Sequence, residues 1–487
     1  RNNSKQFAME TALCFAANGI KTYIFDDYSP TPLVSFAIRN LGANVGINIT
    51  ASHNTKEYNG YKVYLSDGSQ FSSPEDKEII EEINNINDFS ICKTMSEKIA
   101  KKEKLIEYVP KKIWDKYIEI VSKQVINKKA IDIMKNKLKI VYTPLHGTGE
   151  RCISSVIKKF NIKNFFVVES QNDKNGDFCT IKSPNPENRD AFKLGIDLAK
   201  QKKADLVIAT DPDADRIGVL VKNKNNEYIS LTGNMLASIM CEYILHFTKN
   251  IFKNKKSNYD KYYIIKSFVT SRLLDEEAKY YNVEEKICLT GFKWIGKEIL
   301  NNEKLDSNKR KKFLFAAEES YGALVGDYVR DKDSISALLL TIEIASFFKI
   351  KNLDLTQVLN LIYKKYGYFI DNVDSFVYEG ISGKEKMSNI MTFLSKDQVR
   401  DFYDIKVDTF EDYNESMSFD HNTNILDEIK LPRTNAIFYK LEDGSCICIR
   451  PSGTEPKIKI YYQVKGNSEN EAKEKLIKFK KVMNQFM

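Results

Sequence analysis

Short runs of apolar residues alternate with helical patterns along most of the chain. The runs are rich in β-branched and aromatic residues and are nearly continuous, as in strands that are covered on both faces. They occupy residues 22–27, 44–50, 138–143, 164–170, 205–210, 262–268 and 313–320. Stretches with helical spacing, such as residues 77–86 and 234–247, separate them. This alternation predicts repeated βαβ units with mixed, mostly parallel sheets.

The pattern changes after about Lys364, where a polar, turn-rich stretch from residue 372 to residue 421 begins. It leads to strands predicted at 435–441, 445–450 and 457–464 and a final helix at 471–486. A chain of 487 residues is long enough for three or four domains. We therefore predict an α/β protein with three similar α/β domains and a smaller C-terminal α+β domain, spanning residues 1–135, 136–228, 229–363 and 364–487.

Composition narrows the classes of function. The net charge of +8 comes from scattered lysines with no long arginine-rich stripe, which suits small phosphorylated substrates and argues against a nucleic-acid partner. The longest apolar run, residues 335–348, contains Glu343 and is too short to span a bilayer, so no membrane association is expected. Eight cysteines without a C-x-x-C pair, only four histidines and no signal-peptide pattern disfavour zinc and favour a reducing compartment, the cytoplasm. We expect the cysteines to be buried as small apolar residues.

The first candidate for chemistry is "TASHNTKEYNGYKVY", residues 50–64. Ser52 and His53 lie on a predicted loop after a strand, and Lys62 follows ten residues after the serine. The stretch is either a polar turn or the site of a reactive hydroxyl. A serine hydrolase is disfavoured, because adjacent Ser and His do not give the usual orientation of nucleophile and base and no G-x-S-x-G elbow is present.

The second candidate is "ATDPDADRIGV", in which Asp211, Asp213 and Asp215 directly follow a strand. Three carboxylates on one loop can converge on a hard cation. An EF-hand is excluded, because its glycine and glutamate positions are occupied by Arg216 and Lys222. A solvated acidic turn is the alternative, but the carboxyl end of a strand is where open α/β sheets bind ligands.

Three further loops carry polar groups. In "RPSGTEPK", Arg450 can form a planar fork and the following residues can form an anion-binding nest, although a plain turn between strands explains them equally well. The loop "LTGFKWIG", residues 289–296, carries Lys293, and "AAEESYG", residues 316–322, carries two glutamates and a serine that suit sugar hydroxyls. Glutamates at a strand end are more often only solvated.

Together these five stretches specify phosphoryl transfer on a sugar phosphate. Catalysis of that reaction is mainly positioning and neutralisation of charge by a metal and cations. Mg²⁺ takes few protein carboxylates together with phosphate oxygens, which fits the three aspartates and a phosphate on Ser52.

The sequence resembles the α-D-phosphohexomutases, the phosphoglucomutases and phosphomannomutases, over nearly its whole length. "TASHN", "DPDADR", "EESYG" and "RPSGTEPK" are similar to that family's phosphoserine, metal, sugar-binding and phosphate loops and occur in the same order. "TPLHGTG", "PNPE", "LTGFKWIG" and "VRDKD" are most similar to the branch of type-two phosphoglucomutases and phosphopentomutases. The resemblance implies four domains around a central cleft.

The resemblance also implies a role for each matching residue. Ser52 would carry the phosphate, assisted by His53 and Lys62, and the phosphoserine with Asp211, Asp213 and Asp215 would hold one Mg²⁺ per chain. The residues implied to bind substrate are Arg216, Thr290, Gly291, Lys293, Glu318, Ser320, Arg450, Ser452, Gly453 and Thr454. The implied partner is a small sugar phosphate, with glucose 1,6-bisphosphate as activator and intermediate.

We expect interconversion of glucose 1-phosphate and glucose 6-phosphate. Phosphopentomutase activity on ribose or deoxyribose 1-phosphate, phosphomannomutase activity and a non-catalytic binding role are the alternatives. One departure from the family pattern concerns the first domain, which usually opens with a strand and a Gly-Thr-x-Gly-x-Arg loop. That loop is absent, and Arg1 resembles the arginine that follows the first strand, so we expect an incomplete first domain and an impaired site.

Overall fold

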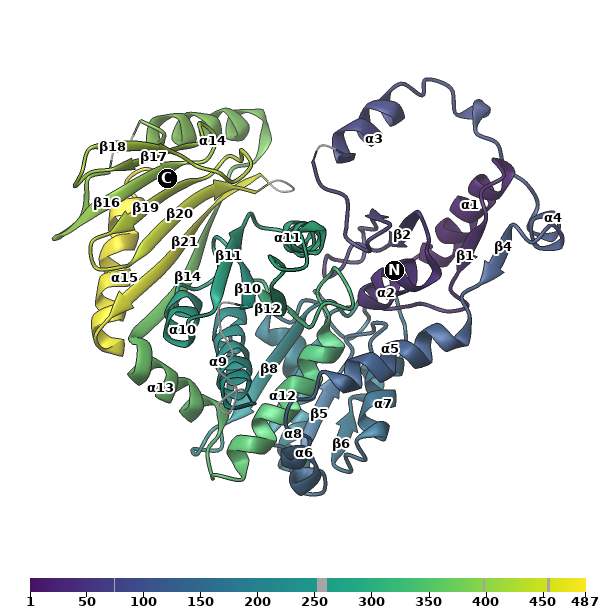
Figure 1. Cartoon of the computed structure of the whole chain (residues 1–487), viewed down its shortest axis with the longest axis horizontal. Helices are drawn as coiled ribbons and strands as arrows, with labels where there is room; N and C mark the ends of the chain where they lie inside the picture. The colour runs from purple at the N-terminus through teal and green to yellow at the C-terminus, as the bar shows by residue number, and fades with distance from the viewer. Residues whose placement is uncertain (74, 252–260, 397–398, 453–455) are drawn as a thin grey trace. The chain divides into compact units, whose positions relative to one another are not determined.

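The structure is a computed structural model that describes residues 1–73, 75–251, 261–396, 399–452 and 456–487 (Figure 1). Two compact units are distinguished. The larger unit comprises Arg1–Ser267 and Tyr281–Val358, and the smaller unit comprises Phe268–Tyr280 and Leu359–Met487. Each contains both helices and strands, and the predicted α/β class with mixed sheets is confirmed.

The N-terminal part of the larger unit contains two separate strand pairs. Strands β1 and β4 are parallel, and β2 and β3 are antiparallel and joined by the loop that carries Ser52. A cavity of about 260 Å³, lined largely by apolar side chains, lies among α1, α2, β1 and β2. The elements of this part are α1 (Ser4–Ala17), β1 (Thr22–Ile24), α2 (Thr31–Leu41), β2 (Val45–Ile49), β3 (Tyr61–Leu65), α3 (Glu75–Asn84), α4 (Glu97–Lys102), β4 (Ile106–Tyr108), α5 (Lys111–Lys123) and α6 (Lys128–Met134).

A five-stranded sheet follows, with the strand order β6-β5-β7-β8-β9. Strand β5 is parallel to β6 and β7, whereas β8 and β9 are antiparallel additions. Every residue of β7 is buried, as its continuous apolar run predicts. The elements are β5 (Ile140–Thr143), α7 (Glu150–Lys159), β6 (Phe165–Val167), α8 (Lys193–Lys202), β7 (Leu206–Thr210), β8 (Ile217–Lys222) and β9 (Tyr228–Leu231).

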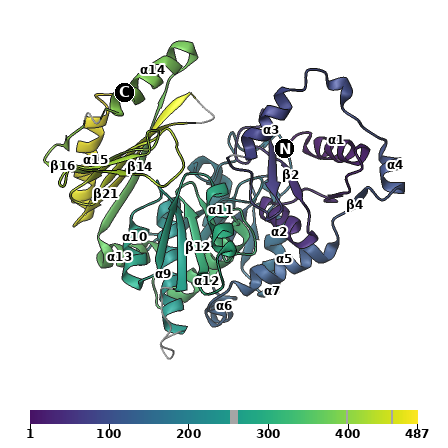
Figure 2. The ribbon, with the colours of Figure 1, turned by 45° about the horizontal axis from the view of Figure 1, so that its top comes forward.

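The last sheet of the larger unit has the order β11-β10-β12-β13, with only β13 antiparallel. Helix α9 lies against β12 and α11 against β10 (Figures 1 and 2). Helix α12 is buried from Ser334 to Ser346, which explains its apolar run. The elements are α9 (Gly233–Ile251), β10 (Tyr262–Ser267), β11 (Glu284–Cys288), α11 (Phe292–Lys304), β12 (Lys312–Glu318), β13 (Gly322–Val325) and α12 (Ser334–Lys349).

The smaller unit is built on an antiparallel sheet of order β14-β21-β20-β19-β16-β17-β18, with β15 paired to β16. Its apolar core is formed by residues of this sheet and of the helices α14 and α15. The elements are α10 (Leu273–Tyr281), α13 (Leu355–Tyr366), β14 (Tyr368–Val377), α14 (Gly380–Leu394), β15 (Asp401–Phe402), β16 (Ile405–Asp412), β17 (Met417–Asp420), β18 (Ile425–Glu428), β19 (Ile437–Leu441), β20 (Cys446–Pro451), β21 (Lys457–Gly466) and α15 (Glu469–Met483).

Two expectations from the sequence are wrong. The stretch from 372 to 421 is not turn-rich, because it contains most of β14, all of α14 and the strands β15 to β17. Strand β14 pairs with β21 over its whole length, and this pairing overrides the low strand propensity of its Asp and Asn residues. The cysteines are all free, but Cys92 and Cys179 are exposed rather than buried.

No helix within the described ranges is long and apolar enough to cross a membrane. The four domain boundaries and the arrangement around a cleft stay predictions.

Candidate active site

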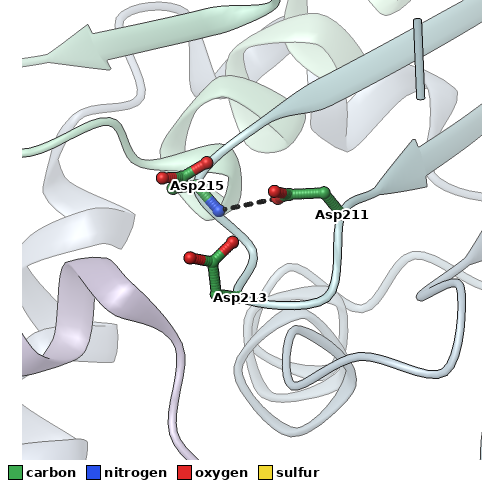
Figure 3. A group of neighbouring side chains, drawn as sticks. All are labelled: Asp211, Asp213 and Asp215. Carbon is green, nitrogen blue, oxygen red and sulfur yellow. Dashed lines mark hydrogen bonds between the residues drawn. The ribbon is translucent and has the colours of Figure 1, made fainter. Parts of the chain in front are cut away.

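The three aspartates lie on the turn from β7 to β8 and are almost completely buried. Their nearest carboxylate oxygens, one from each residue, all lie within 4.8 Å of one another (Figure 3). The turn is not extended, and Ala214 adopts a positive φ of 53°, so the side chains converge through the turn rather than through strand alternation. One oxygen of Asp211, Oδ1, accepts the backbone N–H groups of Asp215 at 3.1 Å and Arg216 at 3.0 Å.

Asp213 and Asp215 each have one carboxylate oxygen that a lysine holds. Lys62 Nζ lies 3.3 Å from Oδ2 of Asp213, and Lys332 Nζ lies 3.2 Å from Oδ2 of Asp215. The other oxygen of each, Oδ1, is buried without a hydrogen-bond partner among the described residues. Buried polar atoms are normally satisfied, so this pair of open oxygens fits a cation bound through one oxygen of each carboxylate.

The charges of the three aspartates are unequal. Burial, together with the neighbouring carboxylates, raises the pKa of Asp211 and of Asp215. Burial acts in the same direction on Asp213, but Lys62 and the hydrogen bond with Asp211 hold the pKa of Asp213 below its usual range. A divalent cation would relieve the repulsion that the like charges create.

Ser52 lies beside this cluster although it is distant in sequence. Its hydroxyl donates to Oδ2 of Asp211 at 2.7 Å, across 159 residues of chain. Ser52 is buried and has a positive φ of 51°, a conformation that is costly for a residue with a Cβ and is concentrated at functional sites. Arg1 supports the loop, because its guanidinium donates to the carbonyl groups of Ser52 at 3.0 Å and Thr55 at 2.7 Å.

The imidazole of His53 also contacts the serine, with Nδ1 3.2 Å from Ser52 Oγ. Burial, reinforced by Arg216, lowers the pKa of His53 to about 3, so the ring is uncharged at neutral pH. A hydroxyl has a single proton, and that of Ser52 points to Asp211. The imidazole is therefore the donor in this contact, which is the reverse of the base role that a serine hydrolase requires.

Lys332 was not identified from the sequence as a site residue. Its ammonium contacts Asp215 and, at 3.4 Å, Asp331, although the side chain is largely buried. Gly322 makes room for it, because a Cβ on Gly322 would lie 2.2 Å from Cδ of Lys332. The only sequence signal was its place in "VRDKD", immediately before Asp333, which caps helix α12.

The predicted sugar loop is joined to the metal loop by backbone contacts. Arg216 forms a β-bridge with Gly322, and the N–H of Ile217 donates to the carbonyl of Tyr321 at 3.0 Å. Glu318, buried at the end of β12, accepts the N–H of Gly291 at 2.6 Å. These contacts bring the metal and sugar loops together.

The remaining predicted residues of these two loops are Thr290, Lys293 and Ser320. Thr290 has a buried hydroxyl oxygen without a hydrogen-bond partner among the described residues, and Ser320 is half-buried at the turn after β12. Lys293 Nζ lies 3.3 Å from a carboxylate oxygen of Asp76. The open hydroxyl oxygen of Thr290 suits a ligand that carries hydroxyl groups.

Arg216 has a partner that the sequence analysis did not select. Its guanidinium lies 2.6 Å from a carboxylate oxygen of Glu187, in the "PNPE" motif, and the arginine side chain is largely buried. The spacing of Arg216 and Glu187 in the sequence does not predict this ion pair, and the motif was noted only through the family resemblance.

The predicted phosphate loop lies in the smaller unit. Arg450 is half-buried near the end of β20, and the N–H of Ser452 donates to the carbonyl of Lys457 at 2.8 Å, which closes the turn toward β21. Gly453 and Thr454 lie outside the described residues. The phosphate-binding role of this loop stays a prediction.

Comparisons with known proteins identify the family of the chain. Four family models match in order: phosphoglucomutase/phosphomannomutase alpha/beta/alpha domain I at residues 1–89, domain II at 115–224, domain III at 232–366 and the C-terminal domain at 401–476. A phosphoglucomutase of Staphylococcus aureus is 35% identical over 466 residues, which cover 96% of this chain and 80% of the relative. One of Staphylococcus haemolyticus is 36% identical over 462 residues, covering 95% and 80%.

Solved structures show the same fold. The phosphoglucomutase parafusin from Paramecium, in an open form, has a TM-score of 0.70 at 19% identity and covers 100% of this chain and 86% of its own. N-acetylphosphoglucosamine mutase from Aspergillus fumigatus, in complex with GlcNAc-6P and magnesium, has a TM-score of 0.52 at 14% identity and covers 98% and 99%.

The matching domains and the relatives define an enzyme that moves a phosphoryl group within a sugar phosphate, a phosphosugar mutase. The chain belongs to the phosphoglucomutase/phosphomannomutase family, within the α-D-phosphohexomutase superfamily, as its sequence motifs indicated.

Proposed function

We propose that the enzyme interconverts glucose 1-phosphate and glucose 6-phosphate through a phosphorylated Ser52. The observation that carries the proposal is the 2.7 Å contact between the Ser52 hydroxyl and the buried Asp211 carboxylate. A reactive hydroxyl and a cation site are thereby in direct contact. The names of the staphylococcal relatives support glucose phosphates as substrates.

The proposed cation is one Mg²⁺ per chain, held by Asp211, Asp213, Asp215 and a phosphate oxygen on Ser52. The open oxygens of Asp213 and Asp215 support this assignment, as does the magnesium in the complex of the Aspergillus mutase. When bound, Mg²⁺ offsets the charge on the oxygens of the transferred phosphoryl group. Lys62 and Lys332 hold the outer oxygens of Asp213 and Asp215 in place.

The proposed reaction consists of two phosphoryl transfers, one from Ser52 to the sugar and one back to Ser52. In the first, the Ser52 Oγ–P bond breaks and a bond forms between phosphorus and the free 6-hydroxyl oxygen of glucose 1-phosphate. The proton of that hydroxyl is lost, and Ser52 Oγ takes up a proton in exchange. The product is glucose 1,6-bisphosphate, a molecule that is present in a complex of the Aspergillus mutase. It turns over within the site before the second transfer.

In the second transfer, Ser52 Oγ bonds to the phosphorus at C1 and loses its proton, while the bond between that phosphorus and the C1 oxygen breaks and this oxygen takes up a proton. The Ser52 proton would pass to Asp211 Oδ2, which accepts the serine hydroxyl, while the uncharged His53 ring donates to Ser52 Oγ. Glu318, Thr290, Gly291 and Ser320 are proposed to hold the sugar hydroxyls.

The loop of Arg450, Ser452, Gly453 and Thr454 is proposed to bind the phosphate that does not react. Arg216 and Lys293 are proposed to line the substrate site. A planar guanidinium matches phosphate oxygens in pairs, which suits both arginines.

Eight free cysteines support a reducing compartment such as the cytoplasm.

Mass spectrometry and mutation test this proposal. A peptide that contains Ser52 should carry about 80 Da of added phosphate, and Ser52→Ala should abolish turnover of glucose 1-phosphate with a trace of glucose 1,6-bisphosphate. Ser155→Ala, which removes an exposed hydroxyl elsewhere, is the matched control. Activity of Ser52→Ala close to that of wild type would refute the nucleophile, and faster turnover of ribose, deoxyribose or mannose 1-phosphate would refute the substrate.

A further inference from the structure

Thr31 holds Asp213 at two points. The backbone N–H of Thr31 donates to the carbonyl oxygen of Asp213 at 2.8 Å, and its hydroxyl donates to Oδ2 of the same aspartate at 3.1 Å. Thr31 is completely buried and is the first residue of α2, so its backbone N–H is not needed within the helix. The first turn of α2 is therefore attached directly to the aspartate loop, 182 residues away.

Asn48 orients the Thr31 hydroxyl. The side-chain amide of Asn48 donates to Thr31 Oγ1 at 2.8 Å. Since the hydroxyl accepts this hydrogen bond and carries one proton, that proton is directed to Asp213. Asn48 lies on β2 directly opposite Lys62 on β3, so one strand pair supplies both the orienting amide and the ammonium that reaches the same Oδ2.

These contacts treat the two oxygens of Asp213 differently. Oδ2 receives the hydroxyls of Thr31 and Thr50 and the ammonium of Lys62, whereas Oδ1 is buried and open. A carboxylate that is free to rotate can present either oxygen or both to a cation. With Oδ2 occupied by three donors, only Oδ1 is presented.

We propose that Thr31 is a positioning residue for the cation site, in which its hydroxyl, oriented by Asn48, locks Asp213 so that only Oδ1 faces the cation. The inference rests on the proposed function, because it assumes that Asp213 is a ligand. Residues that hydrogen-bond to metal ligands fix their orientation, and their loss typically weakens binding by about 10- to 100-fold.

Binding of Mn²⁺ provides a test that does not depend on turnover. The full chain is titrated with Mn²⁺, and the free ion is followed by its electron paramagnetic resonance signal. Thr31→Val keeps the shape of the side chain and removes the hydroxyl, and we expect it to raise the dissociation constant about tenfold. Thr31→Ser restores the hydroxyl and should bind nearly as tightly as wild type. Thr341→Val makes the same change at a buried threonine whose hydroxyl donates to the carbonyl of Ala337 within α12, and it should leave binding unchanged.

Asn48→Ala is a second, milder perturbation in case Thr31→Val does not fold. It leaves the Thr31 hydroxyl in place but free to turn away from Asp213, so binding should weaken less than in Thr31→Val. If folded Thr31→Val, or Asn48→Ala in its place, binds Mn²⁺ as wild type does while Asp213→Asn does not, the role of Thr31 is refuted and the cation site stands. If Asp213→Asn binds as tightly as wild type, the proposed cation site itself is wrong.

Discussion

Replacement of Lys332 by methionine tests whether its ammonium stabilises the fold by neutralising the buried carboxylates of Asp215 and Asp331. Lys332 is 13% exposed and its partners Asp215 and Asp331 are 1% and 5% exposed, so solvent screens these pairs weakly. Burial alone would lower the pKa of Lys332, but Asp215, Asp331 and Glu318 raise it, which keeps the ammonium charged. Lys332→Met fills the same space and leaves the carboxylates unpaired.

Removing one partner of a buried ion pair costs about 3–5 kcal/mol, whereas an exposed pair contributes about 0–1 kcal/mol. Lys349 gives a matched control, because it pairs with Asp205 while its side chain remains 39% exposed. Thermal unfolding followed by circular dichroism, in buffer with EDTA, should show a midpoint about 3–7 °C lower for Lys332→Met and a much smaller shift for Lys349→Met. Equal shifts for the two variants would refute the argument from burial.

Three other perturbations test parts of the site. Gly322→Ala places a Cβ 2.2 Å from Cδ of Lys332 and should destabilise the protein by about 1–3 kcal/mol while lowering activity; an unchanged midpoint in thermal unfolding would contradict this packing. Glu318→Gln keeps the size of the side chain but weakens its hydrogen bond to the N–H of Gly291, so KM for glucose 1-phosphate should rise by about tenfold in steady-state assays. An unchanged KM would show that Glu318 does not take part in substrate binding. Dialysis against EDTA should abolish turnover and added Mg²⁺ should restore it, whereas full activity in the chelator would exclude a required metal.

The sequence predicts individual strands and helices because each depends mainly on the residue pattern within its own short segment. A continuous β-branched run such as residues 205–210 indicates a strand that is buried on both faces, and β7 is such a strand. The aspartates were identified by their spacing after that strand, and the structure brings them together by a turn. The fold class and the family were accessible for the same reason, since each motif is a short contiguous stretch.

Pairing across the chain was decided only by the tertiary structure. Strand β14 exists because β21 lies beside it, and its own Asp and Asn residues predict a turn instead. The roles of Lys332, Glu187 and Thr31 have the same origin, since each is defined by a charge or hydrogen bond to a residue far along the chain.

A sequence thus specifies which groups are available and how each segment folds by itself. It does not specify which buried carboxylate each donor meets, because that depends on the packing of segments more than a hundred residues apart, such as Ser52 and Asp211. Desolvation makes those contacts strong, and burial is a property of the folded chain and not of any short stretch.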